Sequence, residues 1–216
     1  MQAKAETYQN LVDSGVVAVL RGADPETLIE ITEALLAGGV TGIELTADNP
    51  EIDAMLEALD GSFDDEITVG VGTVLDAETA RMAMLAGAEF VVSPSLHKDV
   101  IEICNRYGTL VAPGVMTPTE AIRGYEAGAD LIKVFPASSL GPGHLKSIKG
   151  PYSQIPLMPT GGVDLDNAAD YITAGAECVG AGGALVDYEA ADRGEFDAIT
   201  ENARAFSDVI EAARED

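Results

Sequence analysis

Short apolar runs alternate with amphipathic stretches along the whole chain. Apolar runs rich in Val, Ile and Leu are typical of buried parallel strands, and apolar residues spaced three and four apart are typical of helices. We predict strands over 15–20, 41–46, 67–72, 89–92, 109–112, 130–135, 155–159 and 177–180. We predict helices over 2–14 and 25–36, and further helices that begin near Asn49, Asp76, His97, Thr117, Gly143, Asp164 and Gly194.

The order of these elements predicts the fold class. Eight βα units follow the N-terminal helix, and the short loops between them imply a parallel sheet. A weak repeat supports the count, because Ala-Gly pairs such as Ala127-Gly128 end the helices before the second, fourth, sixth and eighth strands. We therefore expect a single α/β domain over residues 1–216, a (β/α)8 TIM barrel with an extra N-terminal helix. An open doubly wound sheet fits less well, since no G-x-G-x-x-G motif follows an early strand.

A lysine stands in the middle of the sixth predicted strand, with apolar residues on both sides. Burying an unpaired ammonium is costly, so Lys133 needs an explanation. Its head could reach water from an edge strand, or it could be held in a dry pocket where a neutral amine attacks a carbonyl carbon. Because side chains alternate along a strand, Leu131, Lys133 and Phe135 share one face, and Ile132 and Val134 share the other.

The second predicted strand carries an acid in an equivalent pattern. Glu44 and Thr46 share one face, and Ile43 and Leu45 share the other. The apolar pairs suit a helix layer, so we expect Glu44 and Lys133 to point into the barrel together. Such a pair would place a proton-transfer group beside an amine nucleophile, and a purely structural ion pair is the alternative.

Glycines cluster after the last two predicted strands. Gly161 and Gly162 follow Thr160, and Gly182 and Gly183 follow the eighth strand. These are the usual positions of a phosphate site in a (β/α)8 barrel, where exposed backbone N–H groups and a short helix N-terminus receive the anion. Tight turns also use glycine, but two clusters at consecutive strand ends together predict a phosphate site.

The composition excludes several classes of function. The chain has 37 acidic and 12 basic residues, a net charge of -25, which would repel nucleic acid. No apolar run is long enough to span a membrane, and residues 1–6 do not resemble a signal peptide, so we expect no membrane partner. Cys104 and Cys178 lie far apart, which suits a reducing cytoplasm without disulfides. With only His97 and His144, we expect no histidine-based metal site.

Six motifs that follow the predicted strands are familiar as a set. They are Gly42-Ile43-Glu44-Leu45-Thr46, Val71-Gly72-Thr73-Val74, Val92-Ser93-Pro94, Pro113-Gly114-Val115-Met116-Thr117, Ile132-Lys133-Val134-Phe135-Pro136 and Pro159-Thr160-Gly161-Gly162-Val163. Together they resemble the class I aldolase family that acts on 2-keto-3-deoxy-6-phosphogluconate (KDPG) and related 2-keto acids. The resemblance covers the chain from about Val16 to Val186.

This resemblance implies a (β/α)8 barrel, usually a homotrimer, that needs no metal or other cofactor. The lysine matching Lys133 forms a Schiff base with the 2-keto acid, and the glutamate matching Glu44 relays protons through water. The implied reaction cleaves KDPG, a small 2-keto acid sugar phosphate, to pyruvate and glyceraldehyde 3-phosphate in an Entner–Doudoroff type pathway. Further matches line the pocket at Thr73, Pro94, Phe135 and Thr160 and hold the phosphate at Gly161 and Gly162.

The chain departs from the family pattern at two positions. Several relatives carry an arginine four residues after the catalytic glutamate, where it contacts the substrate carboxylate, and this chain has Asp48 there. Arg21, at the end of the first strand, is the expected substitute, as in another branch of the family. Many members also have a serine where this chain has Gly183, which leaves phosphate to the backbone alone.

Other functions are compatible with parts of the sequence. A related aldolase could act on the galactonate epimer, on unphosphorylated 2-keto-3-deoxy acids or on 2-keto-4-hydroxyglutarate. A sugar-phosphate isomerase or epimerase would use the glycine clusters but has no need of Lys133. A non-catalytic sensor of phosphorylated ligands is a third possibility, and no feature of the sequence favours it.

Dispersed acids with few lysines suggest a protein that stays soluble in high salt, and we hypothesise a halophilic source. Because salt screens the repulsion among like charges, the melting temperature should rise between dilute buffer and molar salt. Thermal unfolding followed by circular dichroism tests this, and a higher melting temperature in dilute buffer would contradict it.

Overall fold

The structure, a computed structural model, describes residues 2–22, 24–25, 27–63 and 66–215. Its strands are β1 (Val16–Leu20), β2 (Gly42–Thr46), β3 (Thr68–Gly72), β4 (Phe90–Val92), β5 (Leu110–Ala112), β6 (Gly114–Val115), β7 (Ile132–Val134), β8 (Leu157–Pro159) and β9 (Val179–Ala181). Its helices are α1 (Gln2–Ser14), α2 (Leu28–Ala37), α3 (Ile52–Phe63), α4 (Ala77–Leu85), α5 (Lys98–Tyr107), α6 (Pro118–Glu126), α7 (Pro142–Lys149), α8 (Ala168–Thr173), α9 (Tyr188–Asp192) and α10 (Phe196–Glu215), with a 3-10 turn, η2 (Ala137–Ser139).

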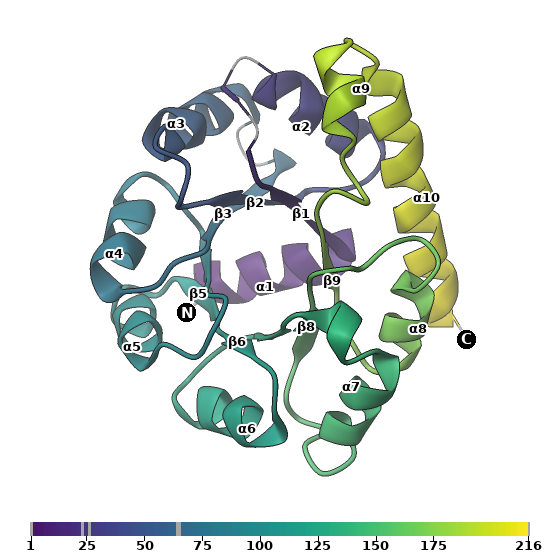
Figure 1. The fold of residues 1–216 in the computed structure, drawn as a ribbon. Helices are drawn as coiled ribbons and strands as arrows, with labels where there is room; N and C mark the ends of the chain where they lie inside the picture. The colour runs from purple at the N-terminus through teal and green to yellow at the C-terminus, as the bar shows by residue number, and fades with distance from the viewer. Residues whose placement is uncertain (1, 23, 26, 64–65, 216) are drawn as a thin grey trace.

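The strands form a curled parallel sheet with helices around its outside (Figure 1). One segment has six strands in the order β5-β4-β3-β2-β1-β9, and the other has three in the order β6-β7-β8. Pro113 separates β5 from β6, and its carbonyl accepts a 3.0 Å hydrogen bond from the N–H of Lys133. A parallel bridge between Thr160 and Gly180 connects the end of β8 to β9. The carboxyl ends of all strands therefore face one side.

Most predicted elements contain an observed one, and the errors lie at their ends. The strand predicted to end at 112 resumes after Pro113 as β6, because proline supplies no N–H to a ladder. The helix predicted to begin near Asp164 begins at Ala168, since the Asp164 carboxylate instead accepts bonds from the N–H groups of Asp166 and Asn167. The helix predicted over 25–36 is observed from Leu28, and residue 26 lies outside the described residues. Neither η2 nor α9 was predicted.

The alternation of side chains along the strands is confirmed. Ile43, Leu45, Ile132 and Val134 belong to the outer core cluster between sheet and helices. Leu131 belongs instead to a smaller cluster on the inner face of the curled sheet. Its members are Leu11, Val17, Phe90, Val92, Leu110, Ala112, Leu131, Met158 and Cys178. The interior beneath the carboxyl ends of the strands is thus filled with apolar side chains.

Helix α1 covers the amino-terminal end of this interior (Figure 1). Leu11, only 2% exposed, packs into the inner cluster with Tyr8 partly buried beside it. Polar bonds hold the helix in place: Ser14 Oγ accepts from the N–H of Gly42 at 3.2 Å, and Lys4 pairs with Asp130 at 2.8 Å. This end of the sheet is closed, which leaves the carboxyl end for a site.

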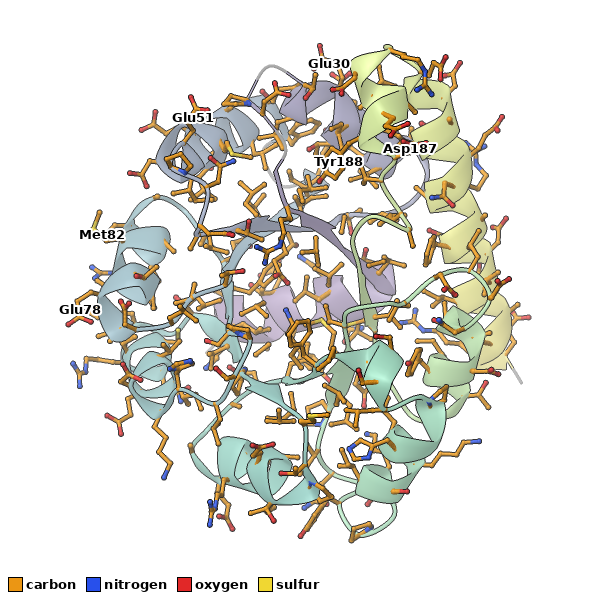
Figure 2. The ribbon with its side chains drawn as sticks, viewed as in Figure 1. Glu30, Glu51, Glu78, Met82, Asp187 and Tyr188 are labelled. Carbon is orange, nitrogen blue, oxygen red and sulfur yellow. The ribbon has the colours of Figure 1, made fainter. Side chains whose placement is uncertain are left out.

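The outer surface agrees with the acidic composition. Glu30, Glu51 and Glu78 point outward from the helical layer (Figure 2). Among the described residues, no helix combines the length and the hydropathy needed to cross a bilayer. Both cysteines are buried free thiols, and burial raises the pKa of Cys104 and of Cys178 to about 12.

Candidate active site

Lys133 and Glu44 meet on the inner face of the curled sheet. Lys133 is 5% exposed and Glu44 is 1% exposed, and Nζ lies 3.8 Å from Oε1. The hypothesis that Lys133 reaches water from an edge strand is therefore wrong, because β7 is paired on both sides and its lysine is buried. The ammonium nitrogen also lies 5.2 Å from the centre of the Phe135 ring. An amine, a carboxyl group and an aromatic face thus converge in one dry place.

The carboxyl group of Glu44 is not saturated with hydrogen bonds. At 3.8 Å, its Oε1 is beyond hydrogen-bond distance of Nζ, and its Oε2 is buried with no partner among the described residues. A structural ion pair in a protein interior normally satisfies its remaining lone pairs. The side-chain oxygens of Ser93 and Thr160 are also buried, and neither has a hydrogen-bond partner in the part of the chain that the structure describes. This unsatisfied polar set favours a site that awaits a ligand over a purely structural pair.

Gly72 makes room for the glutamate. A Cβ atom at this position, the last of β3, would overlap the carboxylate of Glu44. Position 72 therefore requires glycine, because the carboxylate of Glu44 occupies the space that a side chain would need. The next residue, Thr73, has a φ of 60°, a left-handed conformation that is uncommon for a β-branched residue. The backbone after β3 is thus shaped around the neighbouring side chains.

Two side chains hold Arg21 at the carboxyl end of β1. Its Nη1 donates to Asp48 at 2.6 Å, and its Nη2 donates to the hydroxyl of Thr73 at 2.9 Å. A hydrogen bond from Thr46, supported by the Arg21 guanidinium, lowers the pKa of the Asp48 carboxyl. Of the five N–H donors of a guanidinium, these bonds use two. Arg21 is half-exposed and retains donors for an anion.

Phe135 connects the lysine to the first glycine cluster. A Cβ atom on Gly161 would lie 2.9 Å from the Phe135 ring, so the ring packs directly on this glycine. Thr160 is buried, and its hydroxyl lies against Gly180 of β9. The backbone of Pro94 packs against Gly114, whose register partner is Lys133.

The two glycine clusters lie at neighbouring strand ends. Gly161 and Gly162 have φ values of 88° and 81°, which L side chains rarely adopt. Gly162 and Gly183 are exposed, and nothing lies within 4 Å of a Cβ atom built on Gly183. The Thr160–Gly180 bridge brings the two loops together.

Some features of the site could not be found from the sequence. The bond between Arg21 and Asp48 joins residues 27 positions apart, and no local pattern signals it. Ser93 stood within a recognised motif, but its burial without a partner depends on tertiary packing.

Comparison of the chain with known proteins agrees with the geometry of the site. Residues 8–202 match the family described as KDPG and KHG aldolase, where KHG is 2-keto-4-hydroxyglutarate. The chain belongs to this family. Curated KDPG/KHG relatives include the 2-dehydro-3-deoxy-6-phosphogalactonate aldolase of Escherichia coli K12, 34% identical over 77% of this chain and 81% of the relative. The 2-dehydro-3-deoxy-phosphogluconate aldolase of Pseudomonas aeruginosa is also 34% identical, over 84% of this chain and 81% of its own length.

Solved structures of KDPG-type aldolases share the fold. The KDPG aldolase of Legionella pneumophila, captured with pyruvate as a covalent carbinolamine intermediate, superposes with a TM-score of 0.85 at 30% identity, over 93% of this chain and 97% of its own. A structure described as native KDPGal has a TM-score of 0.85 at 31% identity, over 93% and 96% of the two chains. The prediction of the family is confirmed.

The contact between Gly72 and Glu44 leads to a stability prediction. Replacing Gly72 by Ala should lower the free energy of unfolding by about 1–3 kcal/mol, because the added methyl group overlaps a buried carboxylate. Gly61→Ala in α3 is the control, since nothing lies within 4 Å of a Cβ atom there and alanine favours a helix. Urea denaturation measures both variants, and equal midpoints would contradict the close packing.

Proposed function

We propose that the chain is a class I aldolase that cleaves KDPG to pyruvate and glyceraldehyde 3-phosphate. The observation that carries this proposal is the buried pair of Lys133 and Glu44, whose Oε2 has no partner among the described residues. A sugar-phosphate isomerase does not require a lysine that forms a Schiff base. Family membership over residues 8–202 supports the same reaction.

Lys133 acts as the nucleophile. In its neutral form, its amine adds to the C2 carbonyl of the substrate to give a carbinolamine, and loss of water leaves a protonated imine. Glu44, 3.8 Å from Nζ, moves the protons that these two steps require, through water. The cleavage that follows needs no cofactor, because the protonated imine itself accepts the electrons of the broken bond.

Glu44 then takes the proton from the C4 hydroxyl group. The C3–C4 bond breaks, its electrons pass to the imine, and the C4 fragment leaves as glyceraldehyde 3-phosphate. Glu44 returns this proton to C3 of the remaining enamine, and water hydrolyses the resulting imine to release pyruvate and free Lys133. The buried Oε2 of Glu44 is the atom that such a hydroxyl group or water would satisfy.

The remaining residues orient the substrate. We assign the substrate carboxylate to Arg21, whose guanidinium Asp48 and Thr73 hold in position. Phe135 and Thr160 line the pocket beside Lys133, and Thr73 and Pro94 complete it. The phosphate is assigned to the backbone N–H groups of the two glycine loops, at Gly161, Gly162, Gly182 and Gly183.

The galactonate epimer is a second candidate substrate. The E. coli relative that is 34% identical is named for the phosphogalactonate compound. The two substrates differ in one hydroxyl group at C4, and the comparison of their turnover rates by this chain decides between them.

We also infer that the two sheet segments close into one (β/α)8 barrel, forming a single domain in a cytoplasmic protein. The Pro113 carbonyl and the Thr160–Gly180 bridge support closure at the two interruptions. A crystal structure of the chain tests this arrangement.

We infer a homotrimer, and exposed apolar side chains on or just before α4, α5 and α6 support association. They are Leu75, Met82, Leu85, Tyr107, Met116 and Tyr125, each at least 39% exposed. Met82 points outward from α4 in Figure 2. Sedimentation equilibrium should give three times the chain mass of 22.4 kDa, and Met82→Glu should weaken assembly because it buries a charge. A monomeric wild-type protein would contradict this.

Trapping of the imine tests the proposed function. Incubation with pyruvate and reduction with borohydride should leave a stable adduct on Lys133, located by peptide mass spectrometry. Lys133→Met should form no adduct and lose cleavage activity, whereas the control Lys146→Met, at an exposed position on α7, should react as the wild type does. An isomerase or a sensor would form no adduct, and an adduct on another lysine would also exclude the proposed role of Lys133.

A further inference from the structure

The backbone carbonyl groups of the first glycine loop all accept hydrogen bonds from inside the protein. The carbonyl of Thr160 accepts from the N–H of Ala137 at 2.8 Å, and the carbonyl of Gly161 accepts from the N–H of Ser138 at 2.9 Å. In a trans peptide the C=O and the following N–H point in opposite directions. The N–H groups of Gly161 and Gly162 therefore point away from η2.

A side chain holds the third carbonyl of this loop. Asn167 Nδ2 donates to the carbonyl of Gly162 at 3.1 Å, and Asn167 Oδ1 accepts from the N–H of Asp164 at 3.0 Å. Asn167 occupies the N-cap position of α8, where asparagine typically accepts a bond from the first turn of its own helix. Its side chain makes no such bond and is turned back to the glycine loop. Capping therefore does not explain this residue.

The second glycine loop is held less directly, by a side chain from α10. Asn202 Nδ2 donates to the carbonyl groups of Ala184 at 2.8 Å and Leu185 at 2.7 Å. The carbonyl of Gly182 accepts from the N–H groups of Leu185 and Val186. By the same geometry, the N–H of Gly183 points away from these donors.

These bonds leave a set of N–H groups without acceptors. Within the described residues, none of the hydrogen bonds has the N–H of Gly161, Gly162, Val163 or Gly183 as its donor. Several unpaired N–H groups at adjacent loops are the kind of donors that bind an anion. Their direction depends on the carbonyl groups behind them, because each peptide unit turns as one plane.

We propose that Asn167 and Asn202 are positioning residues for the N–H groups that face a substrate phosphate. Asn167 turns the peptide group between Gly162 and Val163, so that the N–H of Val163 faces outward. Asn202 acts less directly: it keeps the N–H groups of Leu185 and Val186 on the carbonyl of Gly182, and this carbonyl sets the direction of the Gly183 N–H. Neither side chain touches the phosphate in this arrangement; each acts through the carbonyl groups that it holds. The proposal rests on the phosphate assignment made above. It explains how a chain with Gly183 in place of a side-chain donor can select phosphorylated substrates.

Single alanine variants test the proposal with two substrates, KDPG and its unphosphorylated counterpart. In Asn167→Ala, kcat/KM for KDPG should fall about tenfold, mainly through KM. This is the loss expected when one backbone N–H group no longer donates to the charged phosphate. Turnover of the unphosphorylated substrate should stay within about twofold of wild type. The inhibition constant of inorganic phosphate should rise by about the same tenfold factor. Asn202→Ala should behave alike, and it decides the question if Asn167→Ala does not fold.

Asn105→Ala is the matched control. Asn105 Nδ2 also donates to the carbonyl of a glycine with positive φ, Gly128, at 3.0 Å, but at the opposite end of the sheet. This variant should turn over both substrates with the same kcat/KM as the wild type. Equal losses for both substrates in Asn167→Ala and Asn202→Ala, or no loss for KDPG, would overturn the positioning role. If inorganic phosphate does not inhibit the wild-type protein and both substrates are turned over equally well, the phosphate site itself is wrong. The adduct on Lys133 would still support the proposed aldolase function in that case.

Discussion

The structure depends on keeping an amine and a carboxyl group together inside an apolar sheet. Taking either charge out of water is expensive, and removing one partner of such a buried pair typically costs about 3–5 kcal/mol. Lys133 and Glu44 are held at 3.8 Å by strands that do not neighbour each other in the sheet. Gly72 supplies the space that the carboxylate needs, and the ring of Phe135 covers the amine. The surrounding fold thus tolerates a pair that is incompletely bonded, and this incompleteness is what chemistry requires.

At the carboxyl ends of the strands, few charged side chains are available to bind an anionic substrate. Arg21 is the cation that two oxygen-bearing side chains orient, and the glycine loops present peptide groups. A chain with a net charge of -25 would normally repel an anionic substrate. In the proposed function, donors fixed in direction by the fold bind the anion locally, without a change in the net charge of the chain. Asn167 and Asn202 fit this scheme because they are neutral and act on the backbone.

Periodicity along the chain was sufficient for the main features. The two-residue alternation in 41–46 and 130–135 placed Glu44 and Lys133 on one face, and the observed distance confirms it. The break at Pro113 and the short helix α9 were not predictable, because a two-residue strand and a one-turn helix carry too few residues for a pattern. The bonds of Asn167 and Arg21 depend on how loops fold over one another. Local sequence assigned Asp164-Leu165-Asp166-Asn167 to a helix start, and it contains no sign that Asn167 turns away from that helix.

The position of helix α1 affects how substrate enters the site and how the products leave it. Leu11 and the inner apolar cluster fill the space beneath Lys133, so in the proposed function substrate and water reach the lysine from the carboxyl ends of the strands. Cleavage frees the aldehyde, whereas the three-carbon remainder stays bonded to Lys133 until water hydrolyses the imine. Entry and exit from the same end of the sheet would therefore impose an order of release on the two products, with the aldehyde first.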